Sequence, residues 1–138
     1  MKAREMKILV VPLAAMVLVA GCASTMSSVP PEEAVRARAE QRWQALVQDD
    51  FAKVYAFTAP SYRKIHSLEH FRDKKQGAPM KWVGARILQI DCDAAKCVIE
   101  AEWESKLAIP FRFNGTLKSA LRETWVLEDG KWWMFENL

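Results

Sequence analysis

Residues 97–107, Cys-Val-Ile-Glu-Ala-Glu-Trp-Glu-Ser-Lys-Leu, alternate between apolar and polar side chains. Apolar residues occupy every second position from Cys97 to Trp103, and glutamates occupy positions 100, 102 and 104. A period of two is typical of a β-strand with one buried and one solvated face. The stretch therefore predicts a half-buried strand. The row Glu100, Glu102 and Glu104 is interpreted as its solvated face, with a metal or a cationic partner as the alternative.

Further strands are predicted on both sides of this one. Residues 80–92 precede it, and residues 116–127 and 131–135 follow. Asn114-Gly115 and Asp129-Gly130 are two-residue turn signals, because both residues of each pair tolerate positive φ. Together with a hairpin after Cys92, they predict a four-stranded antiparallel meander. Leu121, Trp125 and Leu127 would share one face of the third strand.

The N-terminal half has helical signals instead. Apolar residues recur at helical spacing from Val35 to Val47, after a Pro-Pro-Glu-Glu helix start at residues 30–33. Asp49 or Asp50 is expected to cap a second helix, which ends before Pro60. Ser67 is expected to cap a third, through about Lys75. Helices packed on one side of an antiparallel sheet make an α+β fold.

These elements resemble the nuclear transport factor 2-like superfamily. The resemblance covers residues 32–138: a long first helix, a Tyr55…Pro60-x-Tyr62-Arg63 segment, and a final hairpin around Trp125 and Asp129-Gly130-Lys131-Trp132. It implies a strongly curved sheet wrapped around the helices as a cone with a pocket, and frequent homodimerisation through the sheet. The superfamily includes isomerases, dehydratases and hydrolases as well as members without known activity, so the fold does not decide the function.

The N-terminus predicts export and lipidation. A basic start is followed by an apolar run at residues 8–20, which is short for a membrane span but fits a secretory signal. The run ends in Leu18-Val19-Ala20-Gly21-Cys22, which resembles the lipobox of bacterial lipoproteins, whose cysteine is lipidated. The alternative is an ordinary signal peptide with an incidental Cys22. The residues after Cys22 include no Asp at the second mature position, which by resemblance to enterobacterial sorting favours the outer membrane.

The organisation that follows is a removed signal at 1–21, a lipidated Cys22 with a tether through 31, and one domain at 32–138. The chain has 138 residues and a formal charge of +3, of which the signal carries +2. A large multidomain enzyme and a membrane transporter are excluded by size, and a strongly basic nucleic-acid binder is disfavoured. A tether of nine residues reaches roughly 30 Å at most, so the domain would stay close to the membrane.

Two further cysteines lie at the neck of a predicted hairpin. Cys92 and Cys97 bracket four residues between strand-like runs. Opposed cysteines in a hairpin can meet disulfide geometry, and an exported protein meets an oxidising environment. A structural disulfide is therefore expected, with a metal site or a redox pair as the alternatives.

Candidate acid/base residues are Asp50, Tyr55, Tyr62 and His66, because enzymes of the resembled superfamily place an Asp, Tyr or His in the cone. No catalytic motif of that superfamily aligns on them. The alternative is structural: the aspartate caps a helix and the tyrosines fill the core. The stretch from His66 to His70 matches the His-x-x-Glu-His pattern of inverted zincins. A Ser67 cap would leave His66 outside the helix, so no metal is expected.

Aromatic residues are candidate contacts for a ligand or partner. Trp132 and Trp133 are adjacent, so in a strand they face opposite sides. One of them, together with Trp82, would form an aromatic wall or an inter-subunit contact. Phe111 and Phe113 lie between Pro110 and the predicted Asn114-Gly115 turn and form a second candidate contact, at an edge or bend.

The function expected from these observations is a non-catalytic binding or accessory role at the membrane. The ligand would be a small apolar molecule or an envelope protein. The alternatives are a small acid/base enzyme and a structural or assembly component of the envelope. No cofactor and no nucleic-acid partner is expected, since the chain has no phosphate-binding glycine loop, no Gly-x-Ser-x-Gly and no Cys-x-x-Cys.

Overall fold

The computed structural model describes residues 29–108 and 115–137. Helices come first: α1 (Pro31–Val47), α2 (Phe51–Ala56), α3 (Pro60–Ile65) and α4 (Leu68–Lys75). Strands follow: β1 (Met80–Cys92), β2 (Lys96–Leu107), β3 (Leu117–Glu128) and β4 (Lys131–Met134). Their order along the chain confirms the predicted α+β class.

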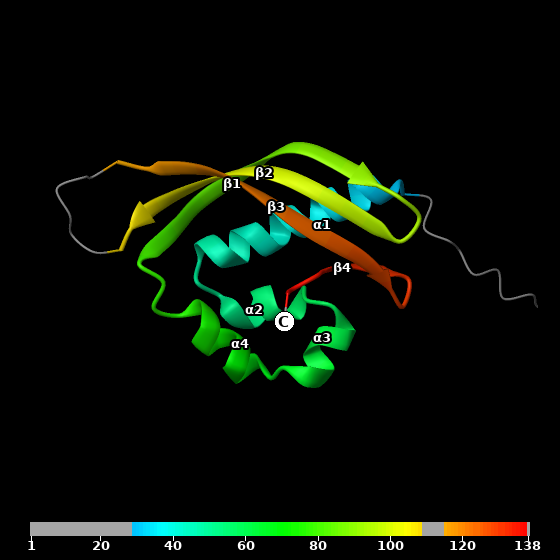
Figure 1. Cartoon of the computed structure of the whole chain (residues 1–138), viewed down its shortest axis with the longest axis horizontal. Helices are drawn as coiled ribbons and strands as arrows, with labels where there is room; N and C mark the ends of the chain where they lie inside the picture. The colour runs from blue at the N-terminus through cyan, green and yellow to red at the C-terminus, as the bar shows by residue number, and fades with distance from the viewer. Residues whose placement is uncertain (1–28, 109–114, 138) are drawn as a thin grey trace, which may run out of the picture.

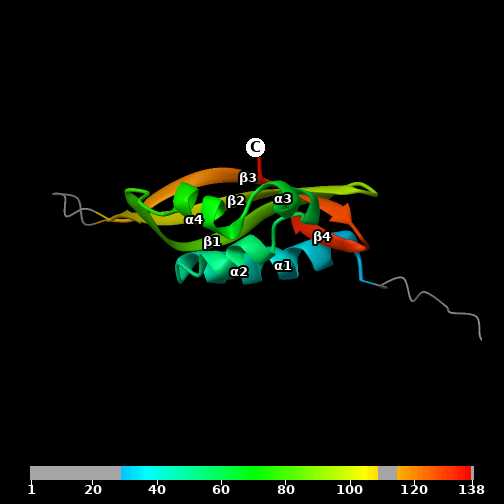
Figure 2. The ribbon, with the colours of Figure 1, turned by 90° about the horizontal axis from the view of Figure 1, so that it is seen from below.

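The strands form one antiparallel meander in the order β1-β2-β3-β4, as predicted. The sheet curves over α1, with α2, α3 and α4 beyond that helix (Figure 1). Register shifts after Trp82 and Ile87 interrupt the β1–β2 ladder, and bulges of this kind bend a strand. Seen from below, the helices cover the inner side of the curved sheet (Figure 2).

The buried face of β2 forms the centre of the core. Cys97, Ile99 and Ala101 are fully buried, and Trp103 is 1% exposed. The glutamates between them pair with cations of the neighbouring strands, as in the 2.9 Å contact from Arg86 to Glu102. The alternation in this strand therefore separates core from solvent as predicted, and the sheet supplies the cationic partners itself.

Local capping signals account for two of the short helices. Asp50 accepts a hydrogen bond from the Lys53 amide at 3.1 Å, and Ser67 accepts from the His70 amide at 3.2 Å. Both are predicted caps. The sequence did not predict α3, because Pro60 was interpreted only as the end of α2. Proline also fits the first turn of a helix, where its fixed φ is helical and its missing N–H is not needed.

The last hairpin has the predicted turn, since Asp129 and Gly130 both adopt positive φ. Asn114 of the other predicted turn, together with Phe111 and Phe113, lies outside the described residues. The predicted apolar face of β3 is only partly a core face. Trp125 is fully buried, but Leu121 and Leu127 are 42% and 41% exposed, because they lie on either side of the short buried stretch from Glu123 to Trp125.

The helical layer is also hydrogen-bonded to β4, at the edge of the sheet. The Met134 amide donates to the Phe57 oxygen at 2.8 Å, and the Ala59 amide donates to the Met134 oxygen at 3.1 Å. This short parallel bridge fixes the link between α2 and α3 against β4. Within residues 29–108 and 115–137, none of the helices is both long and apolar enough to cross a membrane. The predicted signal and Cys22 lie outside those residues.

Candidate functional site

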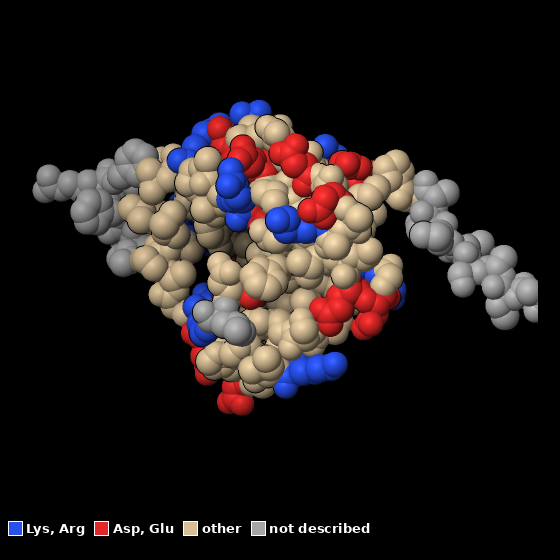
Figure 3. All heavy atoms as spheres, turned by 45° about the vertical axis from the view of Figure 1, so that its right-hand side comes forward, with Lys and Arg blue, Asp and Glu red and all other residues tan. Residues whose placement is uncertain are grey.

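A pocket of about 650 Å³ lies between the inner face of the sheet and the helical layer. It is lined from α1 and the start of α2, from the end of α4 and its connection to β1, and from parts of all four strands. The molecular surface is hollowed between the sheet and the layer below it, with Lys and Arg side chains along the border (Figure 3). The pocket is partly open and has the size of a small-molecule site.

Aromatic and aliphatic side chains make up most of the lining. Trp82 and Trp103 meet edge to face, with ring centroids 4.8 Å apart, and Trp43 also meets Trp103 edge to face, with centroids 5.3 Å apart. The remaining apolar lining comes from Leu46, Phe51, Ala78, Met80, Ala108, Leu121 and Met134. Trp82 was predicted as a ligand contact, and the structure places it in the wall of this pocket.

A buried ion pair forms the polar end of the pocket. Arg42 and Glu123 are 4% and 7% exposed, and the Arg42 Nη1 donates to Glu123 Oε1 at 2.8 Å. The indoles of Trp43 and Trp125 also donate to this carboxylate, at 3.1 Å and 3.4 Å. Three donors therefore hold the Glu123 carboxylate in place, which makes it an anchor for Arg42.

Glu123 accepts a hydrogen bond from Nη1 of Arg42, which leaves the other two guanidinium nitrogens for other partners. Its Nη2 lies 3.5 Å from Glu136, a carboxylate that Lys75 approaches at 3.3 Å. The Arg42 Nε and the Trp103 Nε1 are buried, and neither has an acceptor among the described residues. A buried donor without an acceptor is unfavourable, so this end of the pocket favours a group that accepts hydrogen bonds.

The charged part of the lining is predominantly cationic. Arg42, Lys74, Lys75, Lys81 and Arg122 line the pocket. The acidic lining residues are Asp49 and Glu123. Lys81 pairs with Asp49 at 3.5 Å, and Lys74 forms no ion pair with a described residue. A positive border attracts anionic ligands and disfavours cationic ones.

The predicted acid/base residues lie elsewhere. Asp50 caps α2, the Tyr55 hydroxyl donates to the His66 carbonyl at 2.6 Å, and the rings of Tyr62 and His66 lie 4.6 Å apart. Burial, followed by the charge of Glu136, raises the pKa of Tyr62. The structure brings Tyr55, Tyr62 and His66 together, and none of the four lines the pocket. Their catalytic role stays a prediction.

The two histidines of the His-x-x-Glu-His pattern stack on each other. The His66 and His70 rings are 5.1 Å apart, with His66 just before α4 as the Ser67 cap predicts. No cluster of three or more metal-ligating side chains occurs in the described part of the chain.

Of the two adjacent tryptophans, Trp132 was wrongly considered a possible exposed contact. It is 8% exposed and belongs to the core, opposite Leu127 on the inner face of the β3–β4 hairpin. Trp133 is half-buried, and its Nε1 donates to the Glu128 carbonyl at 2.9 Å. The sequence requires the two side chains to separate, but only the packing shows which one is buried.

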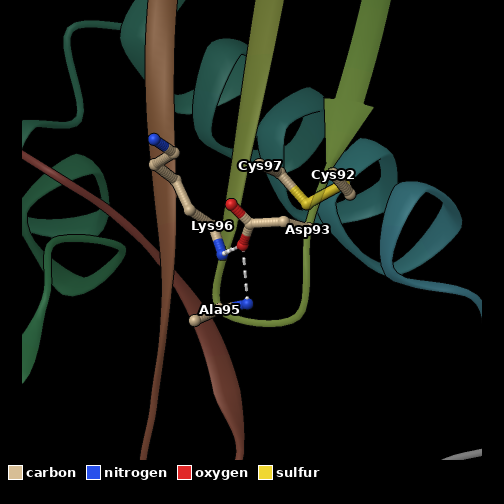
Figure 4. Close-up of a disulfide and its surroundings, with 5 residues drawn as sticks. All are labelled: Cys92, Asp93, Ala95, Lys96 and Cys97. Carbon is tan, nitrogen blue, oxygen red and sulfur yellow. Dashed lines mark hydrogen bonds between the residues drawn. A yellow bond between two sulfur atoms is a disulfide. The ribbon is translucent and has the colours of Figure 1, made fainter.

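The predicted disulfide joins Cys92 and Cys97 across the β1–β2 hairpin (Figure 4). The two residues are directly opposed, with Cα atoms 4.0 Å apart. In the turn, Asp93 accepts hydrogen bonds from the amides of Ala95 and Lys96 at 2.9 Å and 2.8 Å. These two backbone donors hold the pKa of Asp93 below its usual value. The disulfide and the turn stabilise this end of the sheet, away from the pocket.

Sequence reasoning missed Arg42 and Glu123 as site residues. Glu123 shares a strand face with Leu121 and Trp125, so an acidic residue on an otherwise apolar face was the available signal. Arg42 follows Ala39 by three residues on the buried side of α1. Each is a charged residue at a core position, which indicates a buried partner.

Comparison with known proteins shows the fold alone. No protein-family model and no curated protein matches the chain. A SEC-C motif containing protein from Rhodopseudomonas palustris is 17% identical, with a TM-score of 0.54 over 77% of this chain and 75% of that one.

Two other solved structures carry the fold name. A protein from Campylobacter jejuni, named for the NTF2-like transpeptidases, is 14% identical over 75% of this chain and 98% of its own, with a TM-score of 0.51. An NTF2-like protein of unknown function from Prochlorococcus marinus is 10% identical over 78% and 89%, with a TM-score of 0.50. The chain therefore has the nuclear transport factor 2-like fold, with helices packed against a curled four-stranded antiparallel sheet.

Proposed function

We propose that this protein is a membrane-anchored envelope lipoprotein whose pocket binds a small amphipathic molecule without changing it chemically. The observation that carries the proposal is the partly open pocket with an apolar wall and a buried arginine at its end. Pockets of this kind bind apolar ligands by area, and a few polar groups fix their orientation.

The lining favours a particular ligand chemistry. An apolar body fits against Trp82, Trp103 and Leu121, where burial contributes roughly 25 cal/mol per Å² of apolar surface. A carboxylate or another acceptor at one end fits Arg42, whose Nε lacks an acceptor among the described residues. The lysines at the border of the pocket also favour a ligand with a negatively charged end.

Membrane anchoring rests on the sequence around Cys22. The apolar run, the Ala20-Gly21 pair and the cysteine together match a lipobox. Stable anchoring takes more than one acyl chain, as lipoproteins have. The domain would then work within tether reach of the membrane, in the periplasm of a bacterium with an outer membrane. There a pocket for amphipathic molecules has a ready supply of ligands.

Native mass spectrometry on protein gently extracted from its own membranes tests the pocket. Leu121→Trp places a large side chain in the pocket. Leu127→Trp is the matched control, because Leu127 is on the same strand, has nearly the same exposed fraction and does not line the pocket. We expect a reproducible small added mass on the wild type and on L127W, and its loss from L121W.

Three outcomes would count against the proposal. An added mass that persists on L121W would place the ligand outside the pocket. An empty protein that is recovered with an envelope protein or as a homodimer would favour the assembly role. A bound mass whose chemical structure changes during incubation with the protein would favour the enzyme alternative.

A further inference from the structure

A second cationic site lies at the edge of the sheet, away from the pocket. The Arg38 guanidinium of α1 lies 4.7 Å from the centre of the Trp133 ring, and the Arg63 guanidinium of α3 lies 4.9 Å from the same centre. Arg38 also lies 5.0 Å from the Phe57 ring. Three elements thus bring two positive charges to one indole. We call these three residues, Arg38, Arg63 and Trp133, the arginine–tryptophan cluster.

The two charges have no acidic partner in the described part of the chain. Neither Arg38 nor Arg63 forms an ion pair with an aspartate or a glutamate there, although Arg42, Arg86 and Arg122 all do. Among the residues that the structure describes, Arg63 donates only to the Ala56 carbonyl, at 3.3 Å. The Arg38 Nε is buried without an acceptor.

The neighbouring carboxylate, that of Glu128, is hydrogen-bonded to Ser61 and not to the two arginines. Glu128 accepts at 2.9 Å from both the amide and the hydroxyl of Ser61, which occupies its two oxygens. Its backbone carbonyl accepts from the Trp133 indole. The turn that carries this acid therefore orients the tryptophan but leaves the arginines without a counter-charge.

Holding these charges together is unfavourable without an anion. Burial, and after it the charge of Arg63, lowers the pKa of Arg38. The indole face compensates in part, because cation–π contacts are worth about 0.5–2 kcal/mol. The fixed guanidinium groups still present free N–H donors, which match oxyanions in geometry and charge.

We propose that the arginine–tryptophan cluster binds an oxyanion of the phosphate class. A carboxylate has two oxygens and is satisfied by one guanidinium. A phosphate group is tetrahedral, so its free oxygens (three in a monoester, two in a diester) point in different directions and can bridge two guanidiniums. The positive edge of the indole adds to the same attraction. None of the three residues lines the pocket, so the site does not depend on the ligand proposed above.

The phosphate has two possible sources, a lipid headgroup and a soluble phosphate compound. Arg38 lies seven residues into α1, on the order of 10 Å along the helix from its first residue. Both ribbon views place the start of α1, α3 and β4 on the same side of the molecule (Figures 1 and 2). A domain tethered through residues 22–31 could therefore bring this side to a membrane surface.

Titration of the full chain in detergent with inorganic phosphate at low ionic strength, followed calorimetrically, tests the site. Arg38→Gln and Arg63→Gln each remove one guanidinium. Arg36→Gln and Lys64→Gln are matched controls, because they remove an exposed cation from the same helices without touching the ring. We expect phosphate affinity to fall about tenfold or more in R38Q and R63Q and to change little in the controls.

Arg63→Lys keeps the charge but loses the planar fork, so affinity should fall partway. It also serves as the test if R38Q fails to fold, and thermal unfolding monitors this for every variant. Saturating phosphate should raise the unfolding temperature of the wild type more than that of R63K. No detectable phosphate binding, or an equal loss in R36Q and K64Q, would overturn the proposal.

Vesicles distinguish the two sources. Binding of the full chain to phosphatidylcholine vesicles is compared with binding to vesicles that also contain phosphatidylglycerol. An increase on phosphatidylglycerol that R38Q and R63Q lose, but R36Q and K64Q keep, identifies a lipid phosphodiester as the ligand. Phosphate binding in solution without that vesicle effect identifies a soluble phosphate compound. Both results support the oxyanion site.

Discussion

Glu123 joins the sheet to α1 through a set of buried donors. The carboxylate accepts from Arg42 and from the indoles of Trp43 and Trp125, at 2.8, 3.1 and 3.4 Å. A buried charge is tolerated when its lone pairs are filled in this way. Glu123 therefore stabilises the contact between the sheet and α1, and it also positions Arg42 at the end of the pocket.

Glu123→Ala should be strongly destabilising, because it leaves the Arg42 guanidinium buried with only the looser contact to Glu136. Removing one partner of a buried pair costs about 3–5 kcal/mol. Glu100→Ala is the control: it breaks the exposed pair with Arg122, and exposed pairs are worth about 0–1 kcal/mol. Urea denaturation measures both, and equal losses would contradict the anchoring role of Glu123.

Asp93 should make the stability of the protein depend on pH in the acidic range. Its folded-state pKa is lowered, so its contribution is fully present above the ordinary value of 3.8 and is lost as pH falls through the folded value. Asp93→Asn keeps an accepting oxygen but does not titrate, so its stability should fall less between pH 5 and pH 2.5. Thermal unfolding across this range measures the difference.

Asp73→Asn is the control for this pH series, since the exposed Asp73 side chain forms no hydrogen bond or ion pair with a described residue. It should follow the wild-type curve. A D93N curve that coincides with wild type would show that the turn carboxylate does not respond to pH in the folded state.

At the scale of elements, the hairpin turns largely determine how the strands of the sheet pair. The Asp129-Gly130 turn has the two positive φ angles that a tight hairpin needs, and the disulfide closes the other described hairpin. The α3 helix shows the limit of such signals. The preceding helix α2 ends at Ala56, and Pro60 begins α3. Local sequence does not distinguish a proline that ends a helix from one that begins a helix.

Reduction of the Cys92–Cys97 disulfide should lower stability modestly. A cross-link that closes so short a loop restricts the unfolded chain by roughly 2 kcal/mol. The double variant Cys92→Ala with Cys97→Ala should not respond to reductant. Urea denaturation with and without dithiothreitol measures the effect, and an equal response in the double variant would assign it to something other than this disulfide.

At the scale of the whole molecule, the two proposed binding sites are separated. The pocket opens between the sheet and the helices, and the arginine–tryptophan cluster lies where α1, α3 and β4 meet. If the tether holds the domain at a membrane, one feature can contact the surface while the other holds a ligand. This arrangement is consistent with the accessory role proposed above.

Cys22→Ser tests the anchor directly. In a bacterial host, we expect the wild type to have the mass of a chain that starts at Cys22 and carries acyl groups. The variant should keep the full-length precursor mass without lipid. Cys92→Ser is the control and should be lipidated normally. Intact-mass spectrometry of membrane extracts measures all three, and a wild-type chain without acyl mass would contradict the lipoprotein proposal.

The local periodicity of the sequence determined the α+β class, the meander and most element boundaries, because alternation and capping depend on neighbouring residues. It also determined the disulfide, since opposed cysteines follow from the hairpin. Only the tertiary structure decided that Arg42 contacts Glu123 and that Leu121 lines a pocket. It also decided that Trp132 is buried, while the guanidiniums of two arginines lie over the Trp133 ring. Each of these depends on which distant elements pack together, and the curvature of the sheet sets that packing.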